Sequence, residues 1–314
     1  MNKPLRLMCV LAHPDDESLG MGGTLAKYTA EGIETYLVTA TRGERGWFGD
    51  EKDNPGLEAL GKIREAELLN AAKELGIREV EFLDYIDGDL DQANPVEATA
   101  KIVFHLRHIQ PDVVITFDPN GAYGHPDHIA ICQFTTAAVL AAANPNYSNS
   151  ASPHSVTKLY YMAWPKGKFD AYESVFGELV MHIDKVARRT TPWPDWAVTS
   201  IIDTADYWPI VWKAVSCHKT QLAAYGQLEH LSSEHHKSLW GTQEYYRALT
   251  LAWSTEDAFA KLIYSKDCVR RQHEHTAHCT HRNESGGFPH YWAPSCGSNC
   301  RLSGFTPHTS CDDR

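Results

Sequence analysis

The sequence has 314 residues, of which 43% are hydrophobic and 22% are charged, and its formal net charge is −11. These values are typical of a globular protein, and an acidic balance without clustered Lys or Arg argues against a nucleic-acid or anionic-membrane partner. No apolar run reaches the roughly 18 residues of a transmembrane helix, and Met1-Asn2-Lys3-Pro4 leads straight into an apolar run. We therefore expect no membrane span, no signal peptide and a cytoplasmic location.

Strand and helix patterns alternate through the first half of the chain. Short apolar or β-branched runs predict buried strands over residues 5–12, 34–41, 79–83, 112–117 and 158–163. Helical patterns lie between these strands, over residues 17–32, 57–75, 95–109 and 129–143. This alternation predicts an α/β fold with a doubly wound, mostly parallel, Rossmann-like sheet in the strand order 3-2-1-4-5.

The pattern is less regular from residue 165 to residue 262. A long helix is predicted over 206–225 despite Pro209, and a final strand or helix over 245–253. We interpret this region as a C-terminal elaboration that covers the cleft of the core formed by residues 1–164. The two parts together are predicted to make one domain, residues 1–262.

The last residues, 263–314, have a different composition. Within them, residues 270–314 hold six His and four Cys, but Leu302 is their only residue of the types Leu, Ile, Val and Met. Because such a segment lacks the side chains for a hydrophobic core, we interpret 263–314 as a Cys/His-rich tail that is disordered or non-native. A structural zinc knuckle stays open there, although the spacing fits no common ligand pattern.

A polar motif follows the first predicted strand. One imidazole and two adjacent carboxylates stand where this strand turns into a helix, in the stretch Leu11-Ala12-His13-Pro14-Asp15-Asp16-Glu17-Ser18. In an open parallel sheet, ligands bind outside the carboxyl ends of the strands. The motif is therefore predicted to lie at the ligand-binding edge of the sheet.

A second polar motif, Gly124-His125-Pro126-Asp127-His128, follows the fourth predicted strand. In the strand order 3-2-1-4-5, the first and fourth strands are neighbours on either side of the point where the order reverses, and the crevice forms there. Both motifs are therefore expected to face one cleft.

Together the two motifs contain the parts of a hydrolytic metal centre. A catalytic zinc needs three protein ligands and an open position for water, and the candidates are His13, Asp16 and His128. The metal would acidify its water and polarise a carbonyl oxygen. One zinc ion per chain is expected, with other divalent ions left open.

Three further residues have predicted roles in such a centre. Asp15, next to a ligand but free of the metal, is the candidate general base. His125 as an imidazolium would stabilise the oxyanion and protonate the leaving amine, and Asp127 would orient His125. The set predicts hydrolysis of an amide.

The two motifs resemble those of the PIG-L/LmbE family of zinc-dependent N-deacetylases, which remove acetyl groups from N-acetylglucosamine conjugates. The resemblance covers residues 5–255 and implies the same ligands, base and electrophilic histidine as above. It also implies a role near the oxyanion for Tyr123, and contact with the sugar for Arg64 and Asp87. His218-Lys219-Thr220-Gln221 is similar to a late element of the family, whose role stays open.

We therefore expect an amidohydrolase acting on a small N-acetylated amino-sugar conjugate, whose aglycone the sequence does not specify. Two alternatives stay open: a phosphoesterase-like metallohydrolase and a non-catalytic sugar- or metal-binding relative. A dinucleotide-binding protein is disfavoured, because the first turn lacks the Gly-x-Gly-x-x-Gly pattern. A homo-oligomer is compatible with the sequence.

Overall fold

The computed structural model describes residues 4–148, 151–183, 186–189 and 191–251. The predicted tail, residues 263–314, lies outside the described residues. Within the described ranges, no helix combines the length and the apolar character that crossing a membrane requires.

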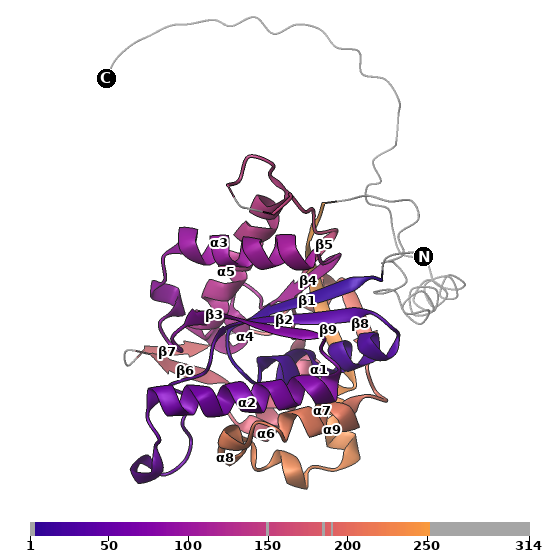
Figure 1. Cartoon of the computed structure of the whole chain (residues 1–314). Coiled ribbons are helices and arrows are strands. Elements are labelled where there is room, and N and C mark those ends of the chain that lie inside the picture. Colours follow the sequence, from indigo (N-terminus) through magenta and orange to yellow (C-terminus); the bar gives the residue numbers. More distant parts are fainter. Residues whose placement is uncertain (1–3, 149–150, 184–185, 190, 252–314) are drawn as a thin grey trace, which may run out of the picture. The chain divides into compact units, whose positions relative to one another are not determined.

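The core of the fold is a seven-stranded sheet in the order β3-β2-β1-β4-β5-β9-β8 (Figure 1). Its strands are β1 (Arg6–Leu11), β2 (Glu34–Thr41), β3 (Glu79–Tyr85), β4 (Val113–Thr116), β5 (Lys158–Met162), β8 (Ser200–Asp203) and β9 (Thr242–Thr250). The first five strands are parallel. Beyond β5 the sheet continues with β9, which pairs antiparallel with both β5 and β8. The predicted fold class and the order 3-2-1-4-5 are confirmed.

Helices cover both faces of this sheet (Figure 1). One face carries α1 (Asp16–Ala30), α2 (Leu57–Leu75) and α7 (Trp208–Val215), which pack against one another. The other face carries α3 (Pro95–Ile109) and α5 (Pro126–Ala143). This sandwich buries β1 and β4 on both sides, in agreement with their continuous apolar sequences.

Local sequence explains where several helices begin and end. The side chain of Asn94 accepts hydrogen bonds from the backbone N–H groups of Val96 and Glu97, and Pro95 occupies the first position of α3. Gly76 ends α2 with a φ of 73°, a left-handed conformation that favours glycine. These signals are local, so the predicted bounds of both helices agree with the structure.

The part after β5 differs from its prediction. The single helix predicted over 206–225 is wrong: α7 ends at Val215, and the chain continues through a 3₁₀ turn, η4 (Lys219–Gln221), into the short α8 (Leu222–Tyr225). Pro209 lies in the first turn of α7, where its missing N–H costs nothing. Of the segment predicted as a strand or helix over 245–253, residues 245–250 belong to strand β9, which ends at Thr250, and residues 252–253 lie outside the described residues.

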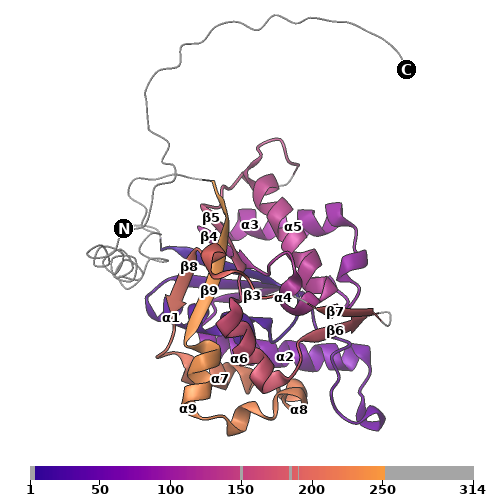
Figure 2. The ribbon, with the colours of Figure 1, turned by 180° about the vertical axis from the view of Figure 1, so that it is seen from behind.

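Three further elements lie largely below the parallel strands in the view of Figure 2. They are α6 (Lys166–Phe176), the hairpin of β6 (Val180–Ile183) and β7 (Val186–Arg189), and α9 (Ser233–Trp240). In that view α9 lies on the left and the β6/β7 hairpin on the right. A second hydrophobic cluster under α6, α7 and α9 contains Tyr172, Val175, Val211, Val215, Leu228, Leu239 and Trp240. The hairpin contacts α4 (Gly121–Gly124), the short turn that precedes α5.

Candidate active site

The two polar motifs meet at the carboxyl ends of β1 and β4, which are paired in the sheet. His13 and Asp16 come from the turn between β1 and α1, and His128 comes from the first turn of α5. All three side chains are nearly or fully buried. The predicted convergence of residues more than a hundred positions apart is therefore present in the structure.

The polar groups of these three side chains form a triangle in which both oxygens of Asp16 take part. His13 Nδ1 lies 3.2 Å from His128 Nε2 and 3.7 Å from Asp16 Oδ2, and His128 Nε2 lies 3.4 Å from Asp16 Oδ1. Ligands bound to a tetrahedral zinc ion at about 2.0–2.2 Å lie about 3.3–3.5 Å from one another. The donor set can therefore hold one such ion.

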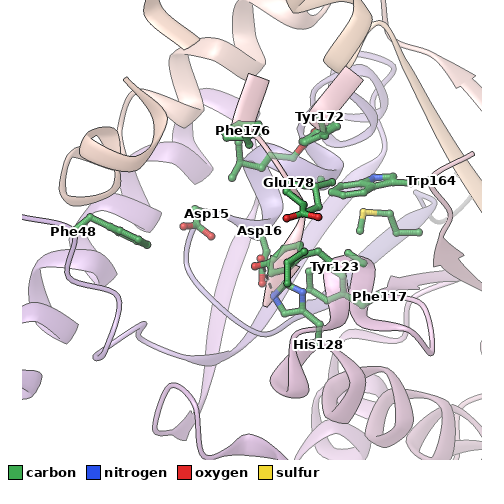
Figure 3. A pocket seen from close by; sticks show the side chains of 16 residues that line it. Asp15, Asp16, Phe48, Phe117, Tyr123, His128, Trp164, Tyr172, Phe176 and Glu178 are labelled. Atoms are coloured by element: carbon green, nitrogen blue, oxygen red, sulfur yellow. Dashed lines mark hydrogen bonds and ion pairs between the residues drawn. The ribbon is translucent and has the colours of Figure 1, made fainter. Parts of the chain in front are cut away.

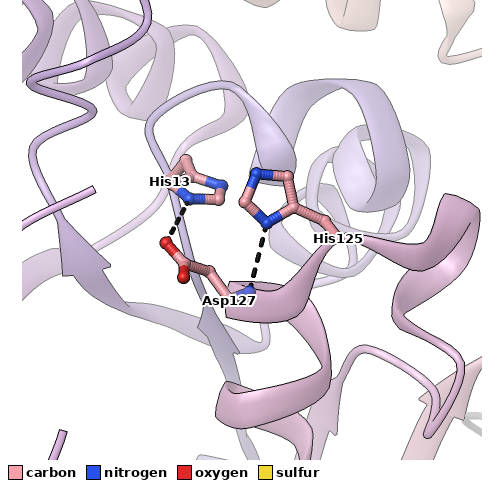
Figure 4. Close-up of side chains that lie close together, drawn as sticks. All are labelled: His13, His125 and Asp127. Carbon is pink, nitrogen blue, oxygen red and sulfur yellow. Dashed lines mark hydrogen bonds and ion pairs between the residues drawn. The ribbon is translucent and has the colours of Figure 1, made fainter. Parts of the chain in front are cut away.

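Two carboxylates contact His13, and Figure 4 shows one of them, that of Asp127. His13 Nε2 lies 3.1 Å from Asp127 Oδ2 and 3.1 Å from Asp87 Oδ1. A carboxylate that accepts the second N–H of a metal-binding histidine fixes its tautomer and ring orientation. Because both carboxylates contact Nε2, Nδ1 is left to face the metal position.

Asp127, which is predicted to orient His125, directs its carboxylate to His13. Its carboxylate holds His13 and also accepts hydrogen bonds from the backbone N–H groups of Gly88 and Leu90. His125 contacts only the backbone of Asp127, since its Nδ1 accepts a hydrogen bond from that N–H group at 3.1 Å. The ring of His125 is thus positioned as the N-cap of α5.

Asp16 is held by the backbone of its own motif. Its Oδ2 accepts hydrogen bonds from the N–H groups of Ala12 at 3.2 Å and His13 at 2.8 Å. Burial alone raises the pKa of Asp16, but the rings of His128 and His13 and the backbone N–H of His13 together lower it to about 2. The carboxyl group is therefore ionised, as a metal ligand must be.

Asp15 occupies a strained turn next to this triangle. Its φ of 107° is rare for a residue with a side chain, and such strain persists only where surrounding contacts enforce it. Its N–H donates to Glu17 Oε2 at 3.0 Å, and Arg64 donates to Asp15 Oδ2 at 3.1 Å and to the carbonyl of Pro14 at 2.7 Å. The hydrogen bonds to Glu17 and from Arg64 therefore hold the turn in this conformation.

The environment of Asp15 suits proton transfer. Burial raises its pKa to about 6, although the Arg64 guanidinium acts in the opposite direction. A carboxylate whose pKa lies just below neutral pH is ionised at pH 7 yet basic enough to accept a proton.

The sequence predicts His125 as a charged imidazolium, and the structure contradicts this charge state. Burial, reinforced by the neighbouring His128 and His13 rings, lowers the pKa of His125 to about 3. The ring is therefore neutral at pH 7, not an imidazolium. Because Nδ1 accepts a hydrogen bond, the proton of the neutral ring lies on Nε2.

Arg64 and Asp87, which the resemblance assigns to the sugar, are both buried and hydrogen bonded within the protein. Arg64 contacts Asp15, Pro14 and the carbonyl of Gly43. Asp87 contacts His13 and accepts a hydrogen bond from the N–H of Arg45. In the structure they support the metal ligands and the base, and their contact with a sugar stays a prediction.

Glu17 and His218 form a buried pair that sequence reasoning missed. His218 Nε2 lies 2.8 Å from Glu17 Oε1, and both side chains are fully buried. The nearby Ser18 hydroxyl also donates to this oxygen. The only available signal was that each residue belongs to a recognisable motif, and the sequence did not indicate that the two motifs touch.

A cavity of about 320 Å³ opens beside the triangle (Figure 3). Asp15, Asp16, Tyr123 and His128 line one part of it. Residues that no motif had marked line the rest: Leu19, Gly20, Phe48, Phe117, Ala122, Met162, Trp164, Tyr172, Phe176, Glu178, Leu179 and Val180. A substrate in this cavity would have direct access to the base and to the metal position.

Comparison with known proteins shows which family the chain is similar to. Residues 8–139 match the family PIG-L, GlcNAc-PI de-N-acetylase. The chain is 36% identical over 239 residues to a 1D-myo-inositol 2-acetamido-2-deoxy-alpha-D-glucopyranoside deacetylase of Rhodococcus opacus, a match that covers 69% of this chain and 82% of the relative. The chain belongs to the PIG-L family.

Two further matches are also named as enzymes that cleave amide bonds, an amidase and a deacetylase. A mycothiol S-conjugate amidase of Streptomyces coelicolor is 30% identical over 295 residues, which cover 83% of this chain and 98% of that one. Among solved structures, the N,N'-diacetylchitobiose deacetylase of Pyrococcus horikoshii is 25% identical with a TM-score of 0.54, covering 69% of this chain and 70% of that one.

The predicted family and the predicted enzyme class are thereby confirmed. These PIG-L relatives are deacetylases and an amidase, so the chain is a hydrolase of amide bonds. The two alternatives, a phosphoesterase and a non-catalytic binding protein, find no support among them.

Proposed function

We propose that this chain is a zinc-dependent deacetylase that removes the N-acetyl group from an N-acetylglucosamine-type conjugate. The observation that carries the proposal is the triangle of His13, Asp16 and His128 with Asp15 beside it, at the edge of one cavity. The named activities of the Rhodococcus deacetylase and the Streptomyces amidase support the substrate class.

The donor set fits zinc better than a harder cation. Two imidazole nitrogens and one carboxylate are typical of catalytic zinc, whereas Mg²⁺ and Ca²⁺ prefer oxygen ligands. When bound there, zinc would lower the pKa of a water molecule and polarise the amide carbonyl. His13, Asp16 and His128 would hold it, with Asp127 and Asp87 fixing the tautomer of His13.

Asp15 is proposed as the general base. It is buried, ionised at neutral pH and held by Arg64 and Glu17, so its carboxylate is ready to take the proton of the attacking water. After the attack, the protonated Asp15 would return this proton to the leaving amine.

His125 and Tyr123 are proposed as hydrogen-bond donors to the developing oxyanion. Neutral His125 offers its Nε2–H, and burial raises the pKa of Tyr123 well above its ordinary value, so its hydroxyl keeps its proton. Donors placed before the reaction stabilise charge without reorganisation. Asp127 contributes by holding His13 and, through its N–H, the ring of His125.

Two variants test the roles of the base and of a metal ligand. Asp15→Asn is expected to bind zinc as the wild type does but to release almost no amine from an N-acetylglucosaminide. His13→Ala is expected to lose the metal, which elemental analysis would detect. Equal loss of zinc in both variants would mean that Asp15 is a ligand and not the base.

His125→Ala is expected to keep its zinc and to lose about two to three orders of magnitude in kcat, the usual effect of removing an oxyanion donor. The matched control is His125→Gln, whose amide can also donate a hydrogen bond and should retain part of the rate. A kcat near that of the wild type in His125→Ala would remove this residue from the mechanism.

A further inference from the structure

The cavity wall that lies away from the metal ligands is a row of stacked aromatic rings (Figure 3). The rings of Trp164 and Tyr172 lie 4.4 Å apart at 21°, and those of Tyr172 and Phe176 lie 5.7 Å apart at 23°. Trp164 and Phe176 are only partly buried against the second hydrophobic cluster, so part of each ring faces the cavity. These three rings line the same cavity as Asp15, the candidate base.

Aliphatic side chains complete this wall, which we call the apolar wall: Leu19, Met162, Trp164, Tyr172, Phe176, Leu179 and Val180. Its polar groups are few. The Tyr172 hydroxyl already donates to the carbonyl of Leu19 at 2.7 Å, and the neighbouring Glu178 carboxylate is paired with Arg189. Among the seven residues of the wall, all of which the structure describes, only Tyr172 and Trp164 carry a polar side-chain atom. The second of these atoms is the indole nitrogen of Trp164.

This composition decides which substituent the wall can bind well. A polyol would exchange its hydrogen bonds with water for contacts with carbon atoms, and each hydroxyl left unpaired costs free energy. An apolar group gains free energy from the same contacts, about fourfold in affinity for each buried methylene. The wall therefore discriminates against a polyol and in favour of a hydrocarbon.

We propose that the apolar wall binds an alkyl or aryl aglycone of the amino-sugar substrate. The inference rests on the proposed function, since the acetamide must lie at Asp15 and the metal ligands for the aglycone to reach the wall. It separates this chain from the Rhodococcus relative, whose named substrate carries inositol. The specificity-determining residues would be Trp164, Tyr172 and Phe176.

The experiment measures amine release by the full-length, zinc-loaded protein from three N-acetylglucosaminides, with methyl, octyl and inositol aglycones. We expect the octyl glycoside to have a kcat/KM at least about tenfold above those of the other two, mainly through a lower KM. Equal kcat/KM values, or a preference for inositol, would overturn the inference and leave the deacetylase function standing.

A variant pair assigns the preference to the wall. In Phe176→Ser, the octyl-to-methyl ratio of kcat/KM is expected to fall toward one. The control is Phe104→Ser, another partly exposed phenylalanine, which lies on α3 and does not line the cavity. An unchanged ratio in a folded Phe176→Ser variant would contradict the inference. If this variant does not fold, the wild-type comparison decides.

A further substrate tests the acyl side of the amide. Methyl N-octanoylglucosaminide places the hydrocarbon on the acyl group. A kcat/KM above that of the octyl N-acetylglucosaminide would show that the wall binds an acyl chain, against our proposal.

Calorimetry gives a readout independent of turnover. Zinc-loaded Asp15→Asn should bind the octyl glycoside at least about tenfold more tightly than the methyl glycoside. Should no glycoside be deacetylated, the proposed function fails while this binding measurement still decides the inference.

Discussion

Glu17 and His218 are 201 positions apart in the sequence, yet His218 Nε2 lies 2.8 Å from Glu17 Oε1 in the interior. The other oxygen of Glu17 accepts the N–H of Asp15, the residue with the strained φ of 107°. The late His-x-Thr-Gln element is thereby connected to the base through a single carboxylate. This contact gives the element a positioning role that its sequence did not specify.

Replacing His218 tests that role. His218→Ala leaves the Glu17 carboxylate buried without its partner, which typically costs about 3–5 kcal/mol. We expect zinc to be retained but kcat to fall more than KM changes, because the turn at Asp15 loses its support. His218→Gln, which can still donate a hydrogen bond, should recover part of both losses. A destabilised variant with wild-type kcat would mean that the pair only supports the fold.

The same pair predicts a dependence of stability on pH. Burial lowers the pKa of His218, but the charge of Glu17 and the hydrogen bond to it outweigh burial, and the net pKa lies above its ordinary value. A raised pKa in the folded state stabilises the protein below the unfolded-state pKa, about 6.5, and this contribution disappears as pH rises through the folded-state pKa. In urea unfolding, the wild type should therefore exceed His218→Gln in stability by more at pH 6 than at pH 9. An equal difference at both pH values would contradict a charged pair.

Arg64 is expected to set the acid side of the pH–activity profile. Burial raises the pKa of Asp15, and the Arg64 guanidinium is the largest influence that lowers it. Arg64→Gln removes this charge, so the pKa of Asp15 should rise and kcat/KM should begin its increase at a higher pH. Arg64→Lys keeps the charge and should shift the profile less. The check is kcat/KM between pH 5 and 8, and identical profiles for both variants would contradict the electrostatic role.

A side chain at position 43 is expected to lower activity by displacing the guanidinium group of Arg64. A Cβ at Gly43 would overlap the guanidinium group of Arg64, and the φ of this glycine is +68°. Gly56 provides a matched control, because its φ is +84° but no atom lies within 4 Å of a Cβ placed there. Both alanine variants should lose about 1–3 kcal/mol of stability from the positive φ, but only Gly43→Ala should lose kcat. Similar activity in the two variants would mean that Arg64 adjusts without disturbing Asp15.

Asp127 is expected to control metal affinity. It accepts hydrogen bonds from Gly88 and Leu90 and contacts His13 Nε2, so an amide in its place cannot satisfy all three contacts. Asp127→Asn should bind zinc about 10–100-fold more weakly, the usual effect of losing such a supporting group. Competition with a chelator measures this affinity. Asp89→Asn is the control, since Asp89 lies between Gly88 and Leu90, the two residues that donate to Asp127, but forms an exposed pair with Arg45. Equal affinities in the two variants would contradict the support of His13 by Asp127.

The sequence by itself determined the elements and the order of the parallel strands. The runs that form β1 and β4 are apolar throughout, and the helices between the strands carry local start and stop signals such as Pro95 and Gly76. Because parallel strands joined by helices can follow few topologies, the two polar motifs had to lie at neighbouring strand ends. The presence of a His/Asp site between β1 and β4 was therefore predictable.

Only the tertiary structure decided which groups touch. The carboxylate of Asp127 contacts His13, whereas only its backbone N–H reaches its sequence neighbour His125. Glu17 likewise meets His218, because hydrogen-bond partners depend on distance in space and on side-chain direction. Burial likewise decides that His125 is neutral, and no local pattern reports burial at a loop residue. The apolar wall comes from Trp164, Tyr172 and Phe176, which carry no motif and acquire a function only because the fold places them beside Asp15.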